Sequence, residues 1–375
     1  MALIPFYKNP IDAISKSYLE EAVTGDCESF VKGFEKDFCK YIGTDHAVST
    51  INASTALHLA LCAIDIKRGD KILCSSNAHP AIPSVIRQFD AEPIFIDIEE
   101  ETLNIDLDQL QETLKEKKAK KLRGIIVSYI AGQTLDLDKF YQIVRKNKIF
   151  VIEDATDCLG AAYKGQKIGS FTADMTIFSF MPFKSNLPAQ GAMLTTCDDE
   201  LYERAMLMKD HAIVKDENTS LNYVHDVVDI GCDYKMAGLD AAYCRTLFDN
   251  LDKDIAARQA IAKRYSDALK GVPHITLPVQ KHDHSFSSYI IKVDKNRDDF
   301  AKELQKKGVE TSVHYMPIHM TKYYREKYEL RITAFPNALR SYGSILSLPI
   351  YPQLSNAEQE SIINAVKETA QNRKW

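Results

Sequence analysis

Lys184 is the residue whose surroundings first suggest chemistry. It lies between apolar stretches in FSFMPFKSNLPAQGAML, residues 178–194, and Ser179 precedes it by five positions. Lysine is almost never fully buried unless it is paired. Lys184 is therefore either an exposed loop residue or a nucleophilic amine that forms a Schiff base with a carbonyl compound.

A second group of polar residues begins a predicted helix. In INASTALHLAL, residues 51–61, a strand gives way to a helix with Ser54 and Thr55 at its start. The free N–H groups and the positive dipole end of a helix N-terminus bind phosphate. The same residues are also ordinary helix caps, so this segment alone does not decide between the two interpretations.

Two carboxylates end a predicted buried strand. KIFVIEDATD, residues 148–157, runs from an apolar stretch into Glu153 and Asp154. A carboxylate at this position fits a structural cap, a metal ligand or the partner of a protonated ring nitrogen. A lysine, an acidic partner, a second hydroxyl at Ser179 and a phosphate-binding helix start are what pyridoxal phosphate requires.

The elements that must position these residues alternate between strand and helix. From about residue 45 to 195, β-rich runs such as GIIVSYI (124–130) and IFVIED (149–154) alternate with helical stretches. This order predicts an α/β fold with a mostly parallel sheet covered on both faces. Ligands of such sheets bind beyond the carboxyl ends of the strands, where the polar residues described above fall.

The pattern changes after about residue 250. A long helical stretch, AARQAIAKRYSDAL (256–269), precedes two short predicted strands, SSYIIKV (287–293) and TSVHYMP (311–317). We predict a large domain over residues 1–250, which includes an N-terminal arm, and a small α+β domain over residues 251–375.

Composition argues against several classes of protein. The 375 residues carry a net charge of −5, which offers no basic surface for nucleic acid. No apolar run of about 18 residues suggests a membrane span, and the first residues lack the pattern of a secretory signal. The eight cysteines are scattered and lack metal-ligand spacing, as expected of reduced core residues. We therefore expect a cytoplasmic protein that binds no metal.

Nine motifs in order resemble the DegT/DnrJ/EryC1/StrS sugar aminotransferases. The resemblance covers nearly the whole chain and implies the type I pyridoxal-phosphate fold, with a large, mostly parallel sheet domain and a smaller C-terminal α+β domain. The motifs are IPF (4–6), FEKDFCKYIGTDHAV (34–48), NASTALHLAL (52–61), AEPIFIDI (91–98), NID (104–106), VIEDATDCLGAAYKGQKIGSF (151–171), FSFMPFK (178–184), HYMPIH (314–319) and LSLPIYPQLS (346–355).

The resemblance implies roles for individual residues. Lys184 looks like the Schiff-base lysine that also moves the proton during amino transfer, and Asp154 resembles the carboxylate that binds the pyridine nitrogen. A lysine at position 184 favours transamination, because relatives that dehydrate sugars carry histidine there. His79 falls where the family places an aromatic ring over the cofactor. The implied phosphate contacts are Ser54, Thr55 and Ser179.

Substrate contacts follow from the same resemblance. His314, Tyr315 and His319 lie where relatives approach the sugar, although a pair of structural histidines at a strand end is an equally good interpretation. In the segment from Asp233 to Lys235, DYK replaces the family's Asn-Tyr-Arg. This segment reaches across the dimer interface in relatives, so the resemblance implies a homodimer with shared active sites.

Several departures from the family pattern bear on recognition. Asp157 replaces the family's glutamine beside the cofactor, and QGA (190–192) replaces Glu-Gly-Gly. Asp233 would place a carboxylate near a phosphate, unless Lys235 compensates, the side chain points away or the carboxyl is protonated. Lys209 replaces an arginine and cannot copy its two-pronged hydrogen bonding.

These observations lead to one expected function and two alternatives. We expect a pyridoxal-phosphate aminotransferase that moves an amino group from L-glutamate to the keto carbon of a nucleotide-linked sugar, with pyridoxamine phosphate carrying the amino group between the two half-reactions. The acceptor is alternatively a free keto sugar acid or an inosose. A sugar-nucleotide-binding relative without catalysis is the third possibility. Polysaccharide or antibiotic sugar synthesis is common in the family.

Overall fold

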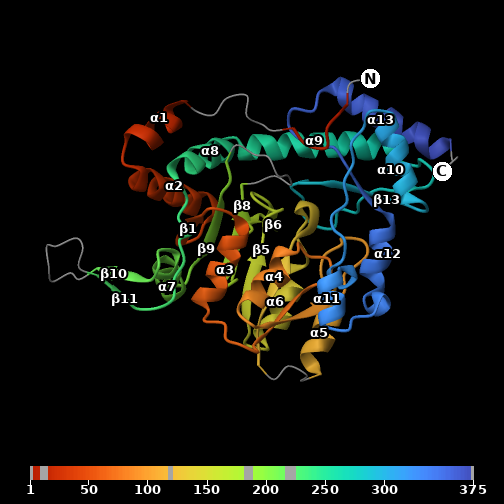
Figure 1. Ribbon diagram of the computed structural model, residues 1–375. Helices are drawn as coiled ribbons and strands as arrows, with labels where there is room; N and C mark the ends of the chain where they lie inside the picture. Colours follow the sequence, from red (N-terminus) through yellow and green to blue (C-terminus); the bar gives the residue numbers. More distant parts are fainter. Residues whose placement is uncertain (1–2, 9–15, 117–120, 181–188, 216–224, 373–375) are drawn as a thin grey trace.

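A seven-stranded sheet forms the centre of the molecule in the computed structural model (Figure 1). The structure describes residues 3–8, 16–116, 121–180, 189–215 and 225–372. Five neighbouring strands run parallel, and β9 runs antiparallel to both of its neighbours, β8 and β1. In spatial order, the strands are β1 (His46–Thr50), β9 (Ala192–Thr196), β8 (Met175–Ser179), β5 (Phe150–Asp154), β4 (Leu122–Ser128), β2 (Lys71–Ser75) and β3 (Glu92–Ile96).

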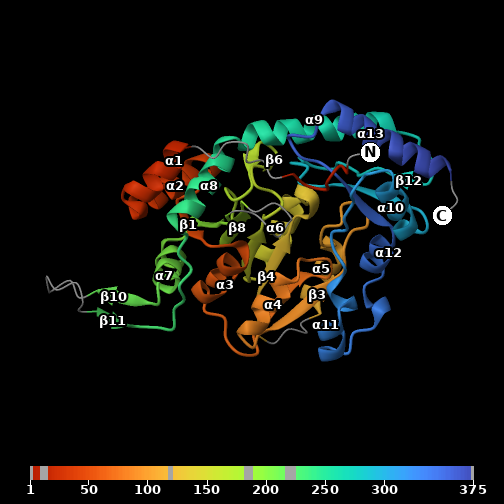
Figure 2. The ribbon, with the colours of Figure 1, turned by 45° about the horizontal axis from the view of Figure 1, so that its top comes forward.

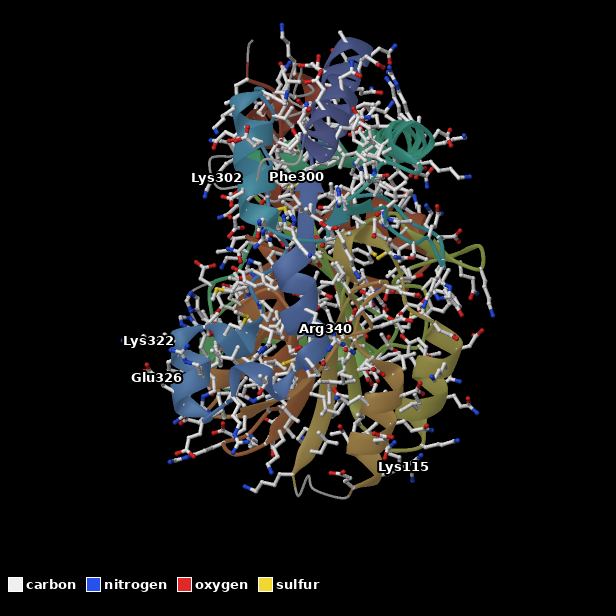
Figure 3. The ribbon with its side chains drawn as sticks, turned by 90° about the vertical axis from the view of Figure 1, so that its right-hand side faces the viewer. Lys115, Phe300, Lys302, Lys322, Glu326 and Arg340 are labelled. Carbon is white, nitrogen blue, oxygen red and sulfur yellow. The ribbon has the colours of Figure 1, made fainter. Side chains whose placement is uncertain are left out.

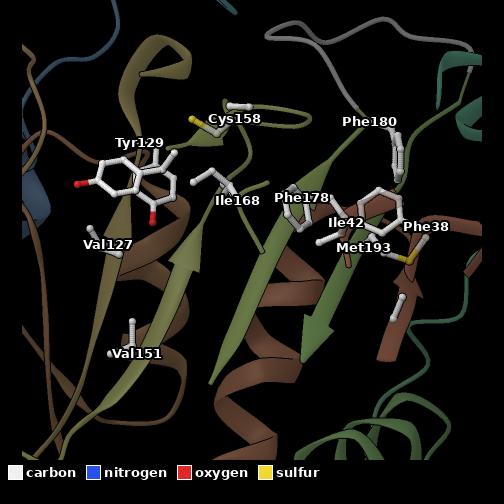
Figure 4. Packing of buried hydrophobic residues seen from close by; sticks show 14 of the residues in the cluster. Phe38, Ile42, Val127, Tyr129, Val151, Cys158, Ile168, Phe178, Phe180 and Met193 are labelled. Carbon is white, nitrogen blue, oxygen red and sulfur yellow. The ribbon is translucent and has the colours of Figure 1, made fainter. Parts of the chain in front are cut away.

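Helices cover both faces of this sheet, because its strands are apolar on both sides. The apolar core on one face lies against α3 (Ala53–Ala63), α4 (Ala81–Gln88) and α7 (Asp199–Lys209). The core on the other face lies against α2 (Cys27–Ile42), α5 (Leu107–Lys115), α6 (Leu137–Arg145) and α8 (Gly238–Asp249). Figure 4 shows the second core, where Phe38 of α2 packs over Phe178 of β8. The predicted α/β fold is confirmed.

A smaller sheet with its own core lies beside the large one (Figure 2). It consists of β12 (Ile275–Thr276), β13 (Tyr289–Val293) and β14 (Ile345–Leu348), covered by α9 (Leu251–Leu269), α10 (Arg297–Lys306) and α13 (Asn356–Gln371). Ile4 belongs to the core of this smaller sheet, and its backbone forms hydrogen bonds with Gly308 and Glu310. The start of the chain therefore packs on the small sheet, and the boundary at residue 250 stays a prediction.

One predicted strand is wrong. Residues 311–317 form only an isolated bridge between Ser312 and Ser347, because the chain leaves the small sheet and continues towards the large one.

The helix α12 (Pro336–Ser344) contacts the large sheet through Asp97. The amides of Asn337 and Ala338, in its first turn, donate to the Asp97 carboxylate at 2.9 Å. Figure 3 shows α12, marked by Arg340, between α10 and α11 (Lys322–Lys327).

The remaining elements are short or peripheral. The hairpin of β10 (Ile213–Lys215) and β11 (His225–Val227) extends away from the body in Figures 1 and 2. Within the described ranges, no helix is both long and apolar enough to cross a membrane. The other elements are α1 (Lys16–Thr24), β6 (Ala162–Tyr163), β7 (Gln166–Lys167) and the 3₁₀ turns η1 (Ile130–Gly132), η2 (Ile318–Met320) and η3 (Ile332–Ala334).

Candidate active site

The two carboxylates at the end of β5 point to opposite sides of the sheet, because side chains alternate along a strand. Glu153 is fully buried, where it accepts hydrogen bonds from Tyr141 and, at 3.2 Å, from Thr176. Asp154 faces a cavity beyond the strand ends instead. Because side chains alternate along the strand, Glu153 has a structural position in the core, whereas Asp154 can contact a ligand in the cavity.

Asp154 is buried among hydrogen-bond donors that oppose the rise in its pKa. The Ser128 hydroxyl and the Thr156 amide each donate to one of its oxygens at 3.3 Å. Burial raises the pKa of the Asp154 carboxyl, and these donors together with His79 act in the opposite direction. A cation placed against this carboxylate would hold it ionised, which is what a protonated ring nitrogen does.

The helix start predicted to bind phosphate lies at the same cavity. Asn52 caps α3 by accepting from the Thr55 amide at 3.0 Å, and the Thr55 hydroxyl donates to the Asn52 carbonyl at 2.7 Å. The Thr55 side chain thus takes part in the cap, and its expected contact with phosphate stays a prediction. Ser54 lines the cavity, and the first turn of a helix leaves N–H groups available for an anion.

These segments enclose a cavity of about 440 Å³ at the carboxyl ends of the strands. A volume of this size lies in the usual range of small-molecule sites, about 300–1,000 Å³. No lysine or arginine is among the described residues that line it. Of the predicted site residues, those that line the cavity are Ser54, His79, Asp154, Asp157, Ser179, His314 and Tyr315.

Asp157, which replaces the family's glutamine, shares the cavity with Asp154. One of its carboxyl oxygens accepts from the Ala131 amide at 3.2 Å. Burial, reinforced by the nearby Asp154 charge, raises the pKa of Asp157 to about 8. The protonated form of Asp157 therefore predominates at neutral pH, and its O–H can donate a hydrogen bond to a ligand as the N–H of an amide would.

Two aromatic side chains close one side of the cavity. His79 is exposed, and its Nδ1 accepts from the Ala81 amide at 3.2 Å, which fixes the ring. The ring of Tyr315 meets the His79 ring edge-on, with centroids 5.5 Å apart. His314 is buried, and its Nδ1 lies 2.8 Å from the Ser347 hydroxyl. His79 can therefore present a face to a ligand, whereas His314 is held by the small sheet.

His319 does not reach the cavity. Its side chain is fully buried, with Nε2 3.0 Å from the Ile332 carbonyl and the ring 4.9 Å from that of Phe335. Burial lowers the pKa of this imidazole. The expected substrate contact of His319 is corrected to a structural role, because its ring joins two turns of the chain.

The segment of Asp233 and Lys235 lies on the surface, away from the cavity of its own chain. Lys235 forms ion pairs with Asp210 and, at 3.3 Å, with Asp233. Within the single chain, Lys235 is therefore placed to offset the charge of Asp233, and the arrangement beside a phosphate stays a prediction. The Ile51 amide donates to the Tyr234 carbonyl at 3.3 Å, so this segment lies beside the loop that precedes α3.

Lys209 is not available for a substrate. It is buried and pairs at 3.4 Å with Glu35 of α2, which also accepts from the amide and hydroxyl of Ser49 at 2.7 Å. Its replacement of an arginine therefore changes a contact inside the protein, not a contact with a ligand that the described residues enclose.

Lys184 lies outside the described residues, so its role stays a prediction. Among the polar residues that line the cavity, sequence reasoning assigned no contact to Asn52, Thr156 and Gln190, although it noted Gln190 as part of a departure from the family pattern. Asn52 has a detectable signal, because a residue of its type before an apolar helical run is a typical cap. Thr156 and Gln190 belong to loops, and the sequence pattern carries no signal for their direction.

The fold and this site define an α/β protein with a buried carboxylate and the first turn of a helix on one cavity. Residues 13–367 match the DegT/DnrJ/EryC1/StrS aminotransferase family, and the chain belongs to that family. It is therefore an aminotransferase, of a class that depends on pyridoxal phosphate.

Individual relatives agree with this assignment. The uncharacterized protein MJ1066 of Methanocaldococcus jannaschii is 32% identical over 352 residues, which cover 91% of this chain and 90% of that protein. The spore coat polysaccharide biosynthesis protein SpsC of Bacillus subtilis is 31% identical over 350 residues, which cover 90% and 89%. The structure of S. venezuelae DesV in complex with a ketimine intermediate matches over 99% of both chains, with 25% identity and a TM-score of 0.86.

Proposed function

We propose that this aminotransferase binds pyridoxal phosphate in the 440 Å³ cavity and moves an amino group from L-glutamate to the keto carbon of a nucleotide-linked sugar. The observation that carries the proposal is the convergence of Asp154, Ser179 and the start of α3 on one cavity. Similarity to SpsC, a polysaccharide biosynthesis protein, supports a sugar as the acceptor.

The residues of the cavity fit this cofactor by their chemistry. When bound, pyridoxal phosphate supplies an electron sink that stabilises negative charge at the carbon that carries the amino group. Asp154 would keep the ring nitrogen protonated. The α3 N-terminus with Ser54, and Ser179 of β8, would hold the phosphate, while His79 would lie against the ring.

Lys184 would provide the amine that attaches the cofactor, and it would carry the proton between the two carbon atoms during transfer. The cavity supports this assignment through its charge. Its described lining has two carboxyls, Asp154 and Asp157, and contains neither lysine nor arginine. Lys184 follows five residues after Ser179, which lines this cavity.

The proposed enzyme is a cytoplasmic homodimer whose sites draw on both subunits. The strip of Asp210, Asp233 and Lys235 is exposed and does not line the cavity of its own chain, so it is free to serve the site of a partner. All eight cysteines are free thiols, which suits a reducing compartment.

Visible spectroscopy tests the proposal. Purified protein is mixed with pyridoxal phosphate, and the spectrum is recorded before and after addition of L-glutamate, beside Lys184→Ala and the control Lys164→Ala. Lys164 is exposed, pairs with Asp138 and does not line the cavity. We expect the band of lysine-bound cofactor in wild type and control, its conversion by glutamate, and no such band in Lys184→Ala. A wild-type spectrum without cofactor absorption contradicts the proposal.

A second experiment identifies the acceptor. Keto sugar nucleotides and keto sugar acids are compared as acceptors of the amino group.

A further inference from the structure

A second, smaller cavity of about 140 Å³ adjoins the first, and Thr156, Asp157 and Ser179 line both. It lies where the large sheet, the small sheet and the described N-terminal residues meet. We call it the Arg258 compartment. Its other polar lining residues are Tyr7, Asp254, Arg258, Ser287 and Tyr351.

Arg258 brings a positive charge to this compartment. Its Nε donates to the Ser285 carbonyl at 3.2 Å, which uses one of the five N–H groups of the guanidinium. No described carboxylate forms an ion pair with it, and burial lowers its pKa without removing the charge at neutral pH. The terminal N–H groups therefore have no anionic partner among the described residues.

Two hydroxyl groups in the compartment also lack partners. Tyr351 is only 1% exposed, and its hydroxyl has no hydrogen-bond partner among the described residues. The Ser287 hydroxyl is likewise buried without one. Buried polar groups are nearly always hydrogen-bonded, because an unsatisfied one costs about 1–3 kcal/mol. Unsatisfied hydroxyls beside a guanidinium form a set of donors that lacks an acceptor.

We propose that the Arg258 compartment binds an oxyanion, a carboxylate or a phosphate group, of one of the two substrates beside the cofactor cavity. A guanidinium matches the planar geometry of such groups and binds them through two parallel hydrogen bonds. The cavity is close in volume to an engineered cavity of about 150 Å³ that holds one benzene molecule. It therefore receives one anionic group and not a whole nucleotide.

Asp254 opposes an anion in this compartment, and its contribution has a predictable sign. It precedes Arg258 by one turn of α9, and burial raises the pKa of its carboxyl while Arg258 lowers it. The protonatable groups that face Arg258 are Asp254 and Tyr7. Removing the Asp254 charge should therefore tighten anion binding, whereas removing the Arg258 charge should weaken it.

Titration calorimetry on the cofactor-loaded enzyme tests this assignment, which rests on the proposed function. The probes are glutarate, a dicarboxylate that cannot donate an amino group, and inorganic pyrophosphate. In Arg258→Gln we expect the dissociation constant of one probe to rise about 10- to 100-fold, the loss of one charged hydrogen-bonding partner. Arg258→Lys should retain part of the affinity, and Asp254→Asn should improve it. Weakening of glutarate alone assigns the compartment to the amino donor, and weakening of pyrophosphate alone assigns it to a phosphorylated acceptor.

The matched control is Arg264→Gln, on the same helix, because the Arg264 guanidinium pairs with Glu360 at 2.7 Å outside the compartment. The proposal is overturned if wild type binds neither probe, or if Arg258→Gln binds both as wild type does. It is also overturned if Arg264→Gln loses as much affinity. If Arg258 only fastens α9 to the Ser285 loop, its variant unfolds at a lower temperature with unchanged affinity. The cofactor spectrum of wild type reports on the proposed function separately.

Discussion

The large cavity and the surface strip of Asp210, Asp233 and Lys235 each bring two aspartates together. In the cavity, the charge of Asp154 acts on the Asp157 carboxyl. No described lysine or arginine lines the cavity to offset these two aspartates. On the surface, Asp210 and Asp233 are both paired with Lys235, and water reaches all three side chains. Equal residue types therefore meet different dielectric surroundings.

The difference shows how desolvation changes the protonation of a pair of carboxyls. Two unit charges 4 Å apart interact by about 1 kcal/mol in water and by about 4 kcal/mol at an effective dielectric constant of 20. The cavity pair accordingly gives up one charge, with the pKa of Asp157 raised to about 8. The exposed pair instead shares Lys235 as an ion-pair partner. The variants described next test whether this distinction holds.

Asp154→Asn should have the largest effect. The amide cannot stabilise a protonated ring nitrogen, so the variant loses a buried charge partner in the proposed reaction. We expect kcat/KM to fall by several thousand-fold, or about 5 kcal/mol, the upper range for such a loss. Steady-state kinetics with L-glutamate and an active keto sugar measures this fall.

Glu153→Gln is the matched control, because the neighbouring carboxylate points to the opposite face of β5. It accepts from Tyr141 and Thr176 in the core, so its loss should lower the free energy of unfolding by about 1–3 kcal/mol. Cofactor absorption should remain. Equal kinetic losses in both variants would mean that the two faces of β5 do not differ in function.

Lys209→Met should have the next largest effect, on stability. The variant leaves the buried Glu35 carboxylate without its cation. Breaking a buried ion pair in this way costs about 3 kcal/mol or more. Urea unfolding measures the loss. The double variant Lys209→Met with Glu35→Gln removes both charges and should recover most of the stability. A double variant as unstable as the single one would show that the ion pair is not the cause.

Local sequence patterns were sufficient for the fold and for part of the site. Strand and helix alternation from residue 45 to 195 predicted the sheet, because periodicity reports burial on one face or both. The carboxylate at Asp154 was predicted from its place after an apolar strand. The same pattern failed at residues 311–317, where the alternation of apolar residues has no neighbouring strand to pair with beyond one bridge.

Contacts between distant segments could not be predicted from local sequence patterns. Lys209 meets Glu35 across 174 positions, so nothing local distinguishes it from a surface cation that binds substrate. His319 is held by Ile332 and Phe335, in a turn formed later in the chain. Arg258 looks like one more basic residue on a long helix until the fold brings Tyr351 to the same compartment. Such roles depend on the folded arrangement.

Asp157→Asn should reveal a pH dependence of moderate size. The folded protein binds a proton at Asp157 up to a pKa of about 8, whereas an unperturbed aspartate releases it near 3.8. The wild type should therefore lose stability relative to Asp157→Asn as pH rises from about 4 to about 8, by about 1.4 kcal/mol for each pH unit. Below pH 4 and above pH 8 the difference should be constant.

Thermal unfolding of both cofactor-free proteins across this pH range measures the difference, and subtraction removes the titration of other groups. A constant difference at every pH would show that Asp157 is ionised in the folded protein. The buried pair would then resemble the exposed one, and the contrast between the two regions would disappear.

Lys235→Ala should have the smallest effect on stability, because exposed ion pairs contribute about 0–1 kcal/mol. Its effect on activity should be larger, about tenfold, if the strip serves a partner's cavity, since an uncompensated Asp233 would then face the cofactor phosphate. Mixing Lys184→Ala with Lys235→Ala separates the two arrangements. In a shared site, each mixed dimer regains one site that has both lysines, so the mixture exceeds the mean activity of the two parents. Activity equal to that mean would place Lys235 and Lys184 in the site of one chain.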